Sequence, residues 1–396
     1  MTQTLALLLD AYRELHSKKL FWITMLLSGL VVVSFGCVGI TEHGVSVLVW
    51  EIPVEFFNSR VMSPATFYKL LFANLGISFW LAWIGIVLAL ISTAGMFPDF
   101  LANGSIDLML SRPIGRWRLF FTKYFMGLLF VTLQVGVFSL ASMLIIGIRG
   151  HSWEPSVLLA VPLVGLMFSY LFCVCTLLGI LTRSTIAALL LTILFWVFLF
   201  GLHTTNQVFV QLREHTAARI EVMQQRIQKM ERGTALMLDK RAAAEKPPAD
   251  ASGSAAEPKP APVTYTAAQL DEANALLPVI RTKLVAEQKD LRTWKRWTLG
   301  LGVARAALPK TAETVELLHN SLIKPQDISR FKAPNEDEDP GLGRDDDDIH
   351  ISGRQMRQRM DELSRAEPLS WIMGTSLGFE VVVVLIAGVI FSRRDF

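Results

Sequence analysis

One carboxylate stands alone inside an apolar stretch of this sequence. Glu380 lies near the middle of residues 371–391, which contain no other charged side chain. An unpaired carboxylate at the centre of a membrane costs several kcal/mol, so such a group usually faces a protein interior or water. Two roles follow for Glu380: a structural hydrogen bond to a neighbouring helix, with Gln134 or Ser139 as partner, or a place on a pathway through the protein.

The three cysteines, Cys37, Cys173 and Cys175, also fall in apolar stretches. Copper binding or redox chemistry would require Cys173 and Cys175 to face one ligand, but residues two apart point to different sides of a helix. Free cysteine otherwise behaves as a small buried hydrophobe. We therefore expect the thiols to pack inside helices, and no disulfide framework in the polar part of the chain.

Common catalytic and nucleotide-binding motifs are missing. The sequence has no Gly-x-x-x-x-Gly-Lys-Ser/Thr phosphate loop, no His-Glu-x-x-His and no Cys-x-x-Cys, and its seven histidines are scattered. Without a phosphate loop, the chain lacks the usual backbone cradle for ATP. We expect no enzyme activity and no cofactor on this chain, and any energy from ATP must come from another polypeptide.

Six stretches are long and apolar enough to cross a membrane, which takes about 20 residues. Backbone polar groups in lipid must be bonded within the segment, so these stretches are expected to be helices. With 52% hydrophobic residues, the predicted fold class is an all-α polytopic membrane protein. The predicted membrane-spanning helices are residues 20–40, 70–96, 119–148, 157–181, 187–208 and 371–391.

Lysine and arginine indicate which ends of these helices face the cytoplasm, because short cytoplasmic loops carry an excess of them. They gather at residues 18–19, 112–123, 183 and 393–394. This pattern predicts a multi-pass protein of the inner membrane with both termini in the cytoplasm. The net charge of +3 reflects these borders more than any nucleic-acid surface, so no partner follows from the charge itself. We expect contact with the lipid membrane and no nucleic-acid partner.

Residues 211–370 then form a large, mainly helical extracytoplasmic insertion between helices five and six. Apolar residues at steps of three and four continue the fifth helix outward. The methionines among them favour core packing over the alternative, a copper relay. This first apolar seam consists of Ile220, Met223, Ile227, Met230 and Met237.

A second seam begins at Leu270, after a capping box of Thr266 and Gln269, and is expected to pair with the first as an antiparallel hairpin. Pro278 should kink this helix or lie in its first turn. Residues 245–263, rich in proline and alanine, read as a flexible, disordered linker. The acidic residues 335–348 lack the ligand spacing of a calcium loop, so a solvated loop is favoured over a calcium site.

The connector between the second and third predicted helices carries the most specific pattern in the chain. It reads Gly104-Ser-Ile-Asp-Leu-Met-Leu-Ser-Arg-Pro-Ile-Gly-Arg116. This run resembles the cytoplasmic connector of type-2 ABC transporter permeases, which often read Gly-(Ser/Thr)-(Ile/Leu)-(Asp/Glu)-Leu-Leu-Leu-Ser-(Arg/Lys)-Pro. The resemblance covers residues 1 to about 210 and 366–396, including the basic tail after the sixth helix.

The resemblance implies a six-helix permease that pairs with a second copy or a paralogue and recruits separate ATPase subunits, which hold ATP and Mg. Residues 1–19 would be an interfacial amphipathic helix, residues 20–210 helices one to five, and residues 371–396 the sixth helix and tail. Residues 98–118 would contain the coupling helix, ended by its proline. Its leucines and methionine would enter an ATPase groove, and its arginines would bind the rim or phospholipid. The implied coupling residues are Asp107, Leu108, Met109, Leu110, Arg112, Pro113, Arg116 and Arg118.

Two departures from the family pattern affect the expected function. Many relatives carry a Glu shortly before the glycine of the connector, where this chain has Asp99 and Asn103. Typical type-2 permeases also have only short outer loops between helices five and six. The resemblance implies an exporter, with Glu380 on or near its pathway. The large insertion raises an alternative, a mechanotransmission subunit that acts on an extracytoplasmic partner, and a scaffold or receptor outside the ABC class stands behind both.

Overall fold

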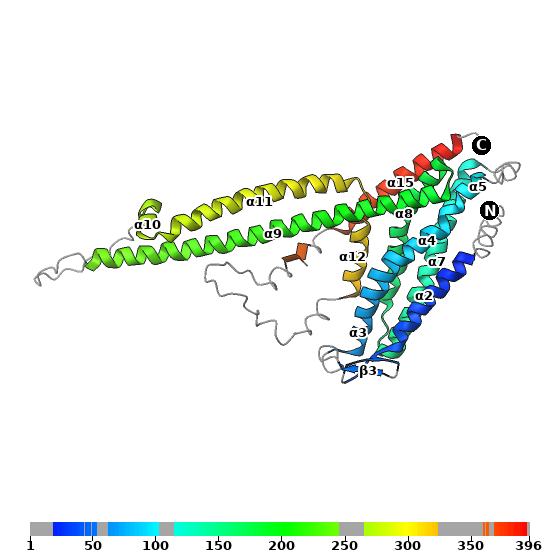
Figure 1. Ribbon diagram of the computed structural model, residues 1–396, viewed down its shortest axis with the longest axis horizontal. Coiled ribbons are helices and arrows are strands. Elements are labelled where there is room, and N and C mark those ends of the chain that lie inside the picture. Colours follow the sequence, from blue (N-terminus) through cyan, green and yellow to red (C-terminus); the bar gives the residue numbers. More distant parts are fainter. Residues whose placement is uncertain are drawn as a thin grey trace, which may run out of the picture. The chain divides into compact units, whose positions relative to one another are not determined.

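The computed structural model describes most of the chain, and its descriptions cover residues 19–42, 44–48, 50–53, 62–102, 115–244, 265–323, 359–360, 362–363 and 368–393. Within these residues, six helical segments are long and apolar enough to cross a membrane (Figure 1). This confirms the predicted multi-pass, mainly helical membrane protein. These segments are Lys19–Cys37, Pro64–Leu101, Arg116–Gly150, Pro155–Thr182, Thr185–Ala242 and Leu369–Arg393.

The chain divides into two compact units, and each is described by itself. The first comprises residues 1–203, 304–341 and 368–396, and the second residues 204–303 and 342–367. The first unit holds the helices of the six candidate membrane spans and, in addition, α12 (Thr311–Leu322). The helices of the spans are α2 (Lys19–Cys37), α3 (Pro64–Leu71), η1 (Phe72–Gly85), α4 (Ile86–Thr93), η2 (Ala94–Met96), α5 (Pro98–Ala102), α7 (Arg116–Gly150), η3 (Pro155–Leu159), α8 (Ala160–Thr182), the first third of α9 (Thr185–Ala244) and α15 (Leu369–Arg393). Among them η1 is a π-helix that joins α3 to α4.

A small antiparallel sheet, absent from the sequence-based expectation, follows α2. Its strands are β1 (Val38–Ile40), β2 (Gly44–Val47) and β3 (Trp50–Pro53), in the order β1-β2-β3, with Val38 opposite Val47 and Val47 opposite Trp50. The Tyr68 hydroxyl donates to the Val38 carbonyl at 2.8 Å, and Arg149 donates to the Gly36 carbonyl at 2.6 Å. The first bond fixes β1 to α3, and the second fixes the end of α2, just before the sheet, to α7.

Close packing between α7 and α8 depends on a glycine. A Cβ atom on Gly127 would lie 2.5 Å from the Phe172 ring, which is almost fully buried and stacks on Tyr124. Overpacking of this kind costs about 1–3 kcal/mol. We expect Gly127→Ala to lower the midpoint of thermal unfolding in detergent. Gly136→Ala, at a position of α7 with open space around the new methyl group, should leave the midpoint unchanged or raise it; equal midpoints for the two variants would contradict this packing.

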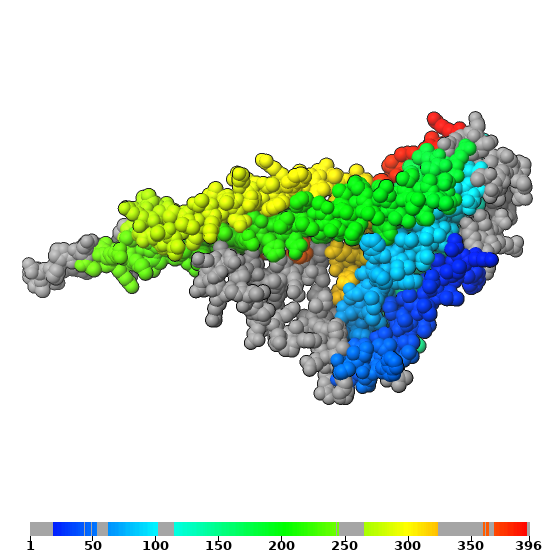
Figure 2. Space-filling model, viewed as in Figure 1, coloured from blue at the N-terminus to red at the C-terminus, as the bar shows by residue number. Residues whose placement is uncertain are grey.

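The second unit is an antiparallel hairpin of the outer part of α9 and α11 (Leu276–Ala306), with the short α10 (Ala267–Ala273) before α11. The Phe209 ring of α9 lies at a tilt to the Trp294 ring of α11, with centroids 5.7 Å apart, and Arg219 of α9 contacts Glu287 of α11 at 3.4 Å. Residue numbers that rise along α9 fall along α11, which confirms the predicted hairpin. In Figure 2, α11 (yellow) lies against α9 (green) along this unit.

Several local predictions for the hairpin can be checked. The capping box of Thr266 and Gln269 is present, and Pro278 lies in the first turn of α11, where its missing N–H costs no helical hydrogen bond. Met223 is buried and Met230 is partly buried, as a packing seam requires. Met237 is 70% exposed, so the predicted seam is wrong at its outer end.

An ion network fixes α10 and α11 to α9. Arg281 donates to Glu231 at 2.6 Å and to Asp271 at 2.8 Å, and the bond to Glu231 raises the pKa of the guanidinium. The side chains are partly exposed, so the network contributes modestly, about 1 kcal/mol. We expect Arg281→Met to speed amide hydrogen exchange in α10 and the first turns of α11. Arg292→Met, at an exposed site of α11, should leave the exchange of α10 and the first turns of α11 unchanged. Equal effects of the two variants would show that the ion network does not fix these helices.

Residues 304–323 group with the membrane helices, which divides the insertion that we expected as one block at residues 211–370. The cause is burial of α12. Thr314, Leu318 and Leu322 are at most 4% exposed and belong to the face that packs against α8 and η1. The predicted linker at residues 245–263 and the predicted acidic loop at residues 335–348 lie outside the described residues. So does the predicted amphipathic helix at residues 1–19, apart from Lys19, which begins α2.

Candidate functional site

Glu380 of α15 joins three membrane helices. One carboxylate oxygen accepts a hydrogen bond from the Tyr124 hydroxyl of α7 at 2.8 Å, and the other accepts from the Ser169 hydroxyl of α8 at 2.8 Å. From the sequence, we expected Gln134 or Ser139 to be the hydrogen-bond partner of Glu380. Neither is bonded to Glu380: among the described residues, the Gln134 side-chain oxygen and the Ser139 hydroxyl are buried and have no hydrogen-bond partner.

The two hydroxyl donors are fixed by their own helices. The Tyr124 ring is 3% exposed and stacks on Phe172 and Phe120, with centroids 5.3 Å and 6.4 Å away. Packing therefore allows the ring few positions, and its hydroxyl points to α15. The Ser169 hydroxyl also lies 2.8 Å from the Leu166 carbonyl of its own helix, so its single proton is shared between this carbonyl and Glu380.

A groove of about 630 Å³ opens beside Glu380, between α7, α8 and α15. Its walls are almost entirely apolar, and the polar side chains that line it are Tyr124, Thr132, Ser169 and Glu380. Glu380 is the only charged residue among them. The site therefore combines one carboxylate, two hydroxyls that position it and a large apolar surface.

The predicted coupling residues fall at the edge of what the structure describes. Asp107, Leu108, Met109, Leu110, Arg112 and Pro113 lie outside the described residues, whereas Arg116 and Arg118 begin α7. Arg116 donates to the Ser392 carbonyl of α15 at 3.0 Å. Next to it, Trp117 packs so closely on Gly388 of α15 that a Cβ there would lie 2.5 Å from the ring. The end of the connector is thus attached to the last two turns of α15.

Other side chains fix the same end of the membrane helices. Asp99 of α5 accepts a hydrogen bond from Thr185 at the start of α9, at 3.2 Å. The Lys123 ammonium of α7 lies 4.8 Å from the centre of the Phe100 ring of α5. The helix before the connector, α5, therefore contacts both α9 and α7, and α7 is the helix that follows the connector.

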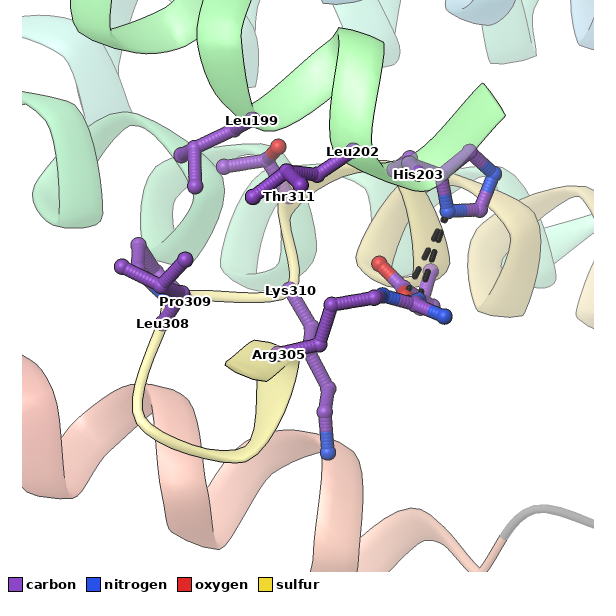
Figure 3. Close-up of a pocket in the computed structure, with 10 residues that line it drawn as sticks. Leu199, Leu202, His203, Arg305, Leu308, Pro309, Lys310 and Thr311 are labelled. Carbon is purple, nitrogen blue, oxygen red and sulfur yellow. Dashed lines mark hydrogen bonds and ion pairs between the residues drawn. The ribbon is translucent and has the colours of Figure 1, made fainter. Parts of the chain in front are cut away.

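A second polar cluster, to which sequence analysis gave no role, joins α9, the end of α11 and α12 (Figure 3). Arg305 forms an ion pair with Glu313, and His203 lies 3.4 Å from the same carboxylate oxygen. These side chains are only 8–17% exposed. At the start of α12, the Lys310 backbone N–H donates to Ser376 of α15 at 2.9 Å, and its ammonium lies 4.2 Å from the centre of the Trp371 ring.

Neither thiols nor acidic residues form a metal centre in the described part of the chain, where no group of three His, Cys, Asp or Glu side chains is placed to hold an ion. Cys173 and Cys175 are buried, and the Cys173 thiol bonds the Tyr170 carbonyl, which fits the packing role expected from the sequence. Ser376 stands in a Gly-x-Ser-x-Gly pattern, residues 374–378. It lies inside helix α15 and bonds the Ile372 carbonyl, unlike the exposed nucleophile of a strand-to-helix turn.

Comparison of the chain with protein-family models, curated proteins and solved structures gives no match. The class that the structure itself defines is a multi-pass helical membrane protein. Within it, a carboxylate-bearing groove lies among α7, α8 and α15, and α15 also holds the end of the connector.

Proposed function

We propose that this chain is the membrane-spanning subunit of an ABC transporter of the type-2 permease class, an exporter of the inner membrane with both termini in the cytoplasm. The observation that carries the proposal is the pattern from Gly104 to Arg116, placed between two membrane-spanning helices. The ATPase, with its ATP and Mg, is a separate subunit, and the permease works as a pair with a second copy or a paralogue.

The contacts of α15 support a route by which ATP-driven movement reaches the groove. A force on the connector acts on Arg116 and Trp117, and these residues bond or pack against Ser392 and Gly388. Glu380 lies about two turns before Gly388 in α15, about 12 Å away at 1.5 Å per residue. A shift of α15 moves this carboxylate relative to Tyr124 and Ser169, so the groove would change with each ATPase cycle.

The proposal is tested by purifying the tagged chain from the membranes of its own host. We expect a polypeptide with a phosphate-binding loop to co-purify in near-stoichiometric amount, and the complex to hydrolyse ATP. Vanadate, which arrests ABC ATPases, should abolish the hydrolysis. A well-folded preparation with no such polypeptide and no hydrolysis would overturn the proposal.

The hairpin of α9 and α11 favours a second candidate, a mechanotransmission subunit that acts on an extracytoplasmic partner. Because the His203 and Arg305 side chains lie 3.5 Å apart, a short Gly-Ser loop can replace residues 204–303 and keep α12 in place. For an exporter, we expect this variant to keep ATP hydrolysis and to rescue a strain that lacks the gene. Hydrolysis without rescue would favour mechanotransmission instead.

A further inference from the structure

The Glu380 groove offers a carboxyl group in apolar surroundings. Among the described residues that line the groove, none is Lys, Arg or His, and the bonds that Glu380 accepts come from neutral hydroxyls. Each carboxylate oxygen has a further lone pair beyond the hydroxyl it already accepts. A carboxylate in apolar surroundings is costly unless it is paired, so the groove favours a ligand that brings a positive charge.

Aromatic rings line the same groove as the carboxylate. Phe121 and Phe125 of α7 line the groove with Tyr124, and the Phe121 and Phe125 rings stack with centroids 6.3 Å apart. Phe125 is 58% exposed, so its face is available to a ligand. Aromatic faces attract alkylated ammonium groups through cation–π interactions, and a nearby carboxylate adds direct charge attraction.

The size and lining of the groove fit an alkyl chain attached to such a head. A volume of about 630 Å³ lies within the range of small-molecule sites. At about 1.5 Å per residue, the wall from Phe121 to Thr132 extends about 16 Å along α7. Leu166, Val381 and Leu385 make the opposite walls apolar.

We propose that the groove around Glu380 binds a single-chain amphiphile with a cationic, alkylammonium head, the head at Glu380 and the chain along α7, α8 and α15. A zwitterionic phospholipid fits less well, because its phosphate lies next to its ammonium and is repelled by the carboxylate. That the bound amphiphile is the exported cargo rests on the proposed function. Binding itself needs neither ATP nor an ATPase.

The test measures saturable binding of radiolabelled dodecyltrimethylammonium to the purified full chain in phosphatidylcholine nanodiscs, with empty nanodiscs subtracted. We expect unlabelled dodecyltrimethylammonium to compete, and dodecanol and dodecyl sulfate to fail. Glu380→Gln should weaken binding roughly tenfold or more, since it removes the charge and keeps the shape. Equal competition by dodecanol, or unchanged binding by Glu380→Gln, would show an ordinary lipid contact and overturn the proposal.

A second variant tests the groove without changing Glu380, in case Glu380→Gln misfolds. A Cβ atom on Gly165 meets only the Thr132 hydroxyl, at 3.7 Å, so Gly165→Leu fills the groove without striking backbone. Gly136→Leu adds the same side chain where nothing lies within 4 Å of the new Cβ. We expect Gly165→Leu to abolish binding and Gly136→Leu to preserve it. The same loss in both, or in neither, contradicts the site.

The two proposals fail in different ways. Cation binding by a chain with which no ATPase co-purifies supports the amphiphile site and overturns the transporter function. ATP hydrolysis by a complex that binds no cation above empty nanodiscs overturns the amphiphile site and leaves the transporter function standing.

Discussion

Reversing the charge of the connector, with Arg112→Glu and Arg116→Glu together, is expected to remove most of the ATPase from the purified chain. If the two arginines bind acidic groups on the ATPase, each reversal replaces a charge-assisted contact by repulsion. Charge-assisted hydrogen bonds contribute about 1.5–3 kcal/mol each, so we expect co-purified ATPase and ATP hydrolysis to fall by about tenfold or more. The measurement is the ratio of ATPase to permease after purification.

Arg116 also bonds the Ser392 carbonyl, so a fall caused by damage to α15 has to be separated from a lost interface. Arg112→Glu alone leaves that bond intact and should still lower the ratio. Arg149→Glu reverses a charge at the other end of α7, the helix that begins at Arg116, and should not change the ratio of ATPase to permease. An unchanged ratio in the double variant, or an equal fall in Arg149→Glu, counts against the coupling helix.

The Arg305–Glu313 pair should dominate the docking of α12. Both side chains are more than four-fifths buried, and breaking a buried pair by removing one partner costs about 3–5 kcal/mol, because the other charge stays behind. We expect Arg305→Met to lower the unfolding midpoint and to expose α12 to protease. Glu313→Gln should do the same.

The double variant Arg305→Met with Glu313→Gln distinguishes an ion pair from two independent packing sites. With both charges removed, no buried charge is left unpaired, so the loss of stability should be smaller than in either single variant. If the fall in unfolding midpoint of the double variant instead equals the sum of the falls of the two single variants, the two residues act separately.

Hydropathy located the membrane helices because each contains about 20 apolar residues, a requirement that lipid imposes on any sequence. The capping box at Thr266 and the antiparallel hairpin were also predictable, since both depend on spacing within one or two helices. The small sheet was not, because its strands are three or four residues long. β1 takes the last residues of the segment predicted as the first helix, residues 20–40, and β2 and β3 lie in a segment read as a loop.

The docking of α12 could have been found from its spacing. Thr311, Thr314, Leu318 and Leu322 recur at steps of three and four, and they form the buried face of the helix. The segment was grouped with the insertion because it lies far from the membrane helices in sequence. Spacing identifies a buried face, but it does not say which helices cover that face.

The candidate site was predictable in part. Glu380 stood out because one charge in an apolar helix is conspicuous, but its partners depend on the depth and tilt at which α7 and α8 meet α15. Ser169 and Tyr124 therefore gave no signal in the sequence beyond being polar within predicted helices. Arg116 was expected to bind the ATPase rim or phospholipid, and its bond to Ser392 required the tertiary structure.

The proposal that an ATPase binds the connector is tested most directly by site-specific cross-linking in host membranes. A photoreactive amino acid is placed at Met109, in the connector, and in a matched protein at Leu48, an exposed turn in the small sheet. We predict that Met109 cross-links to a polypeptide with a phosphate-binding loop and that Leu48 does not. Cross-links from Met109 to other proteins only, or equal cross-linking of the ATPase from both positions, would contradict the coupling of this chain to an ATPase.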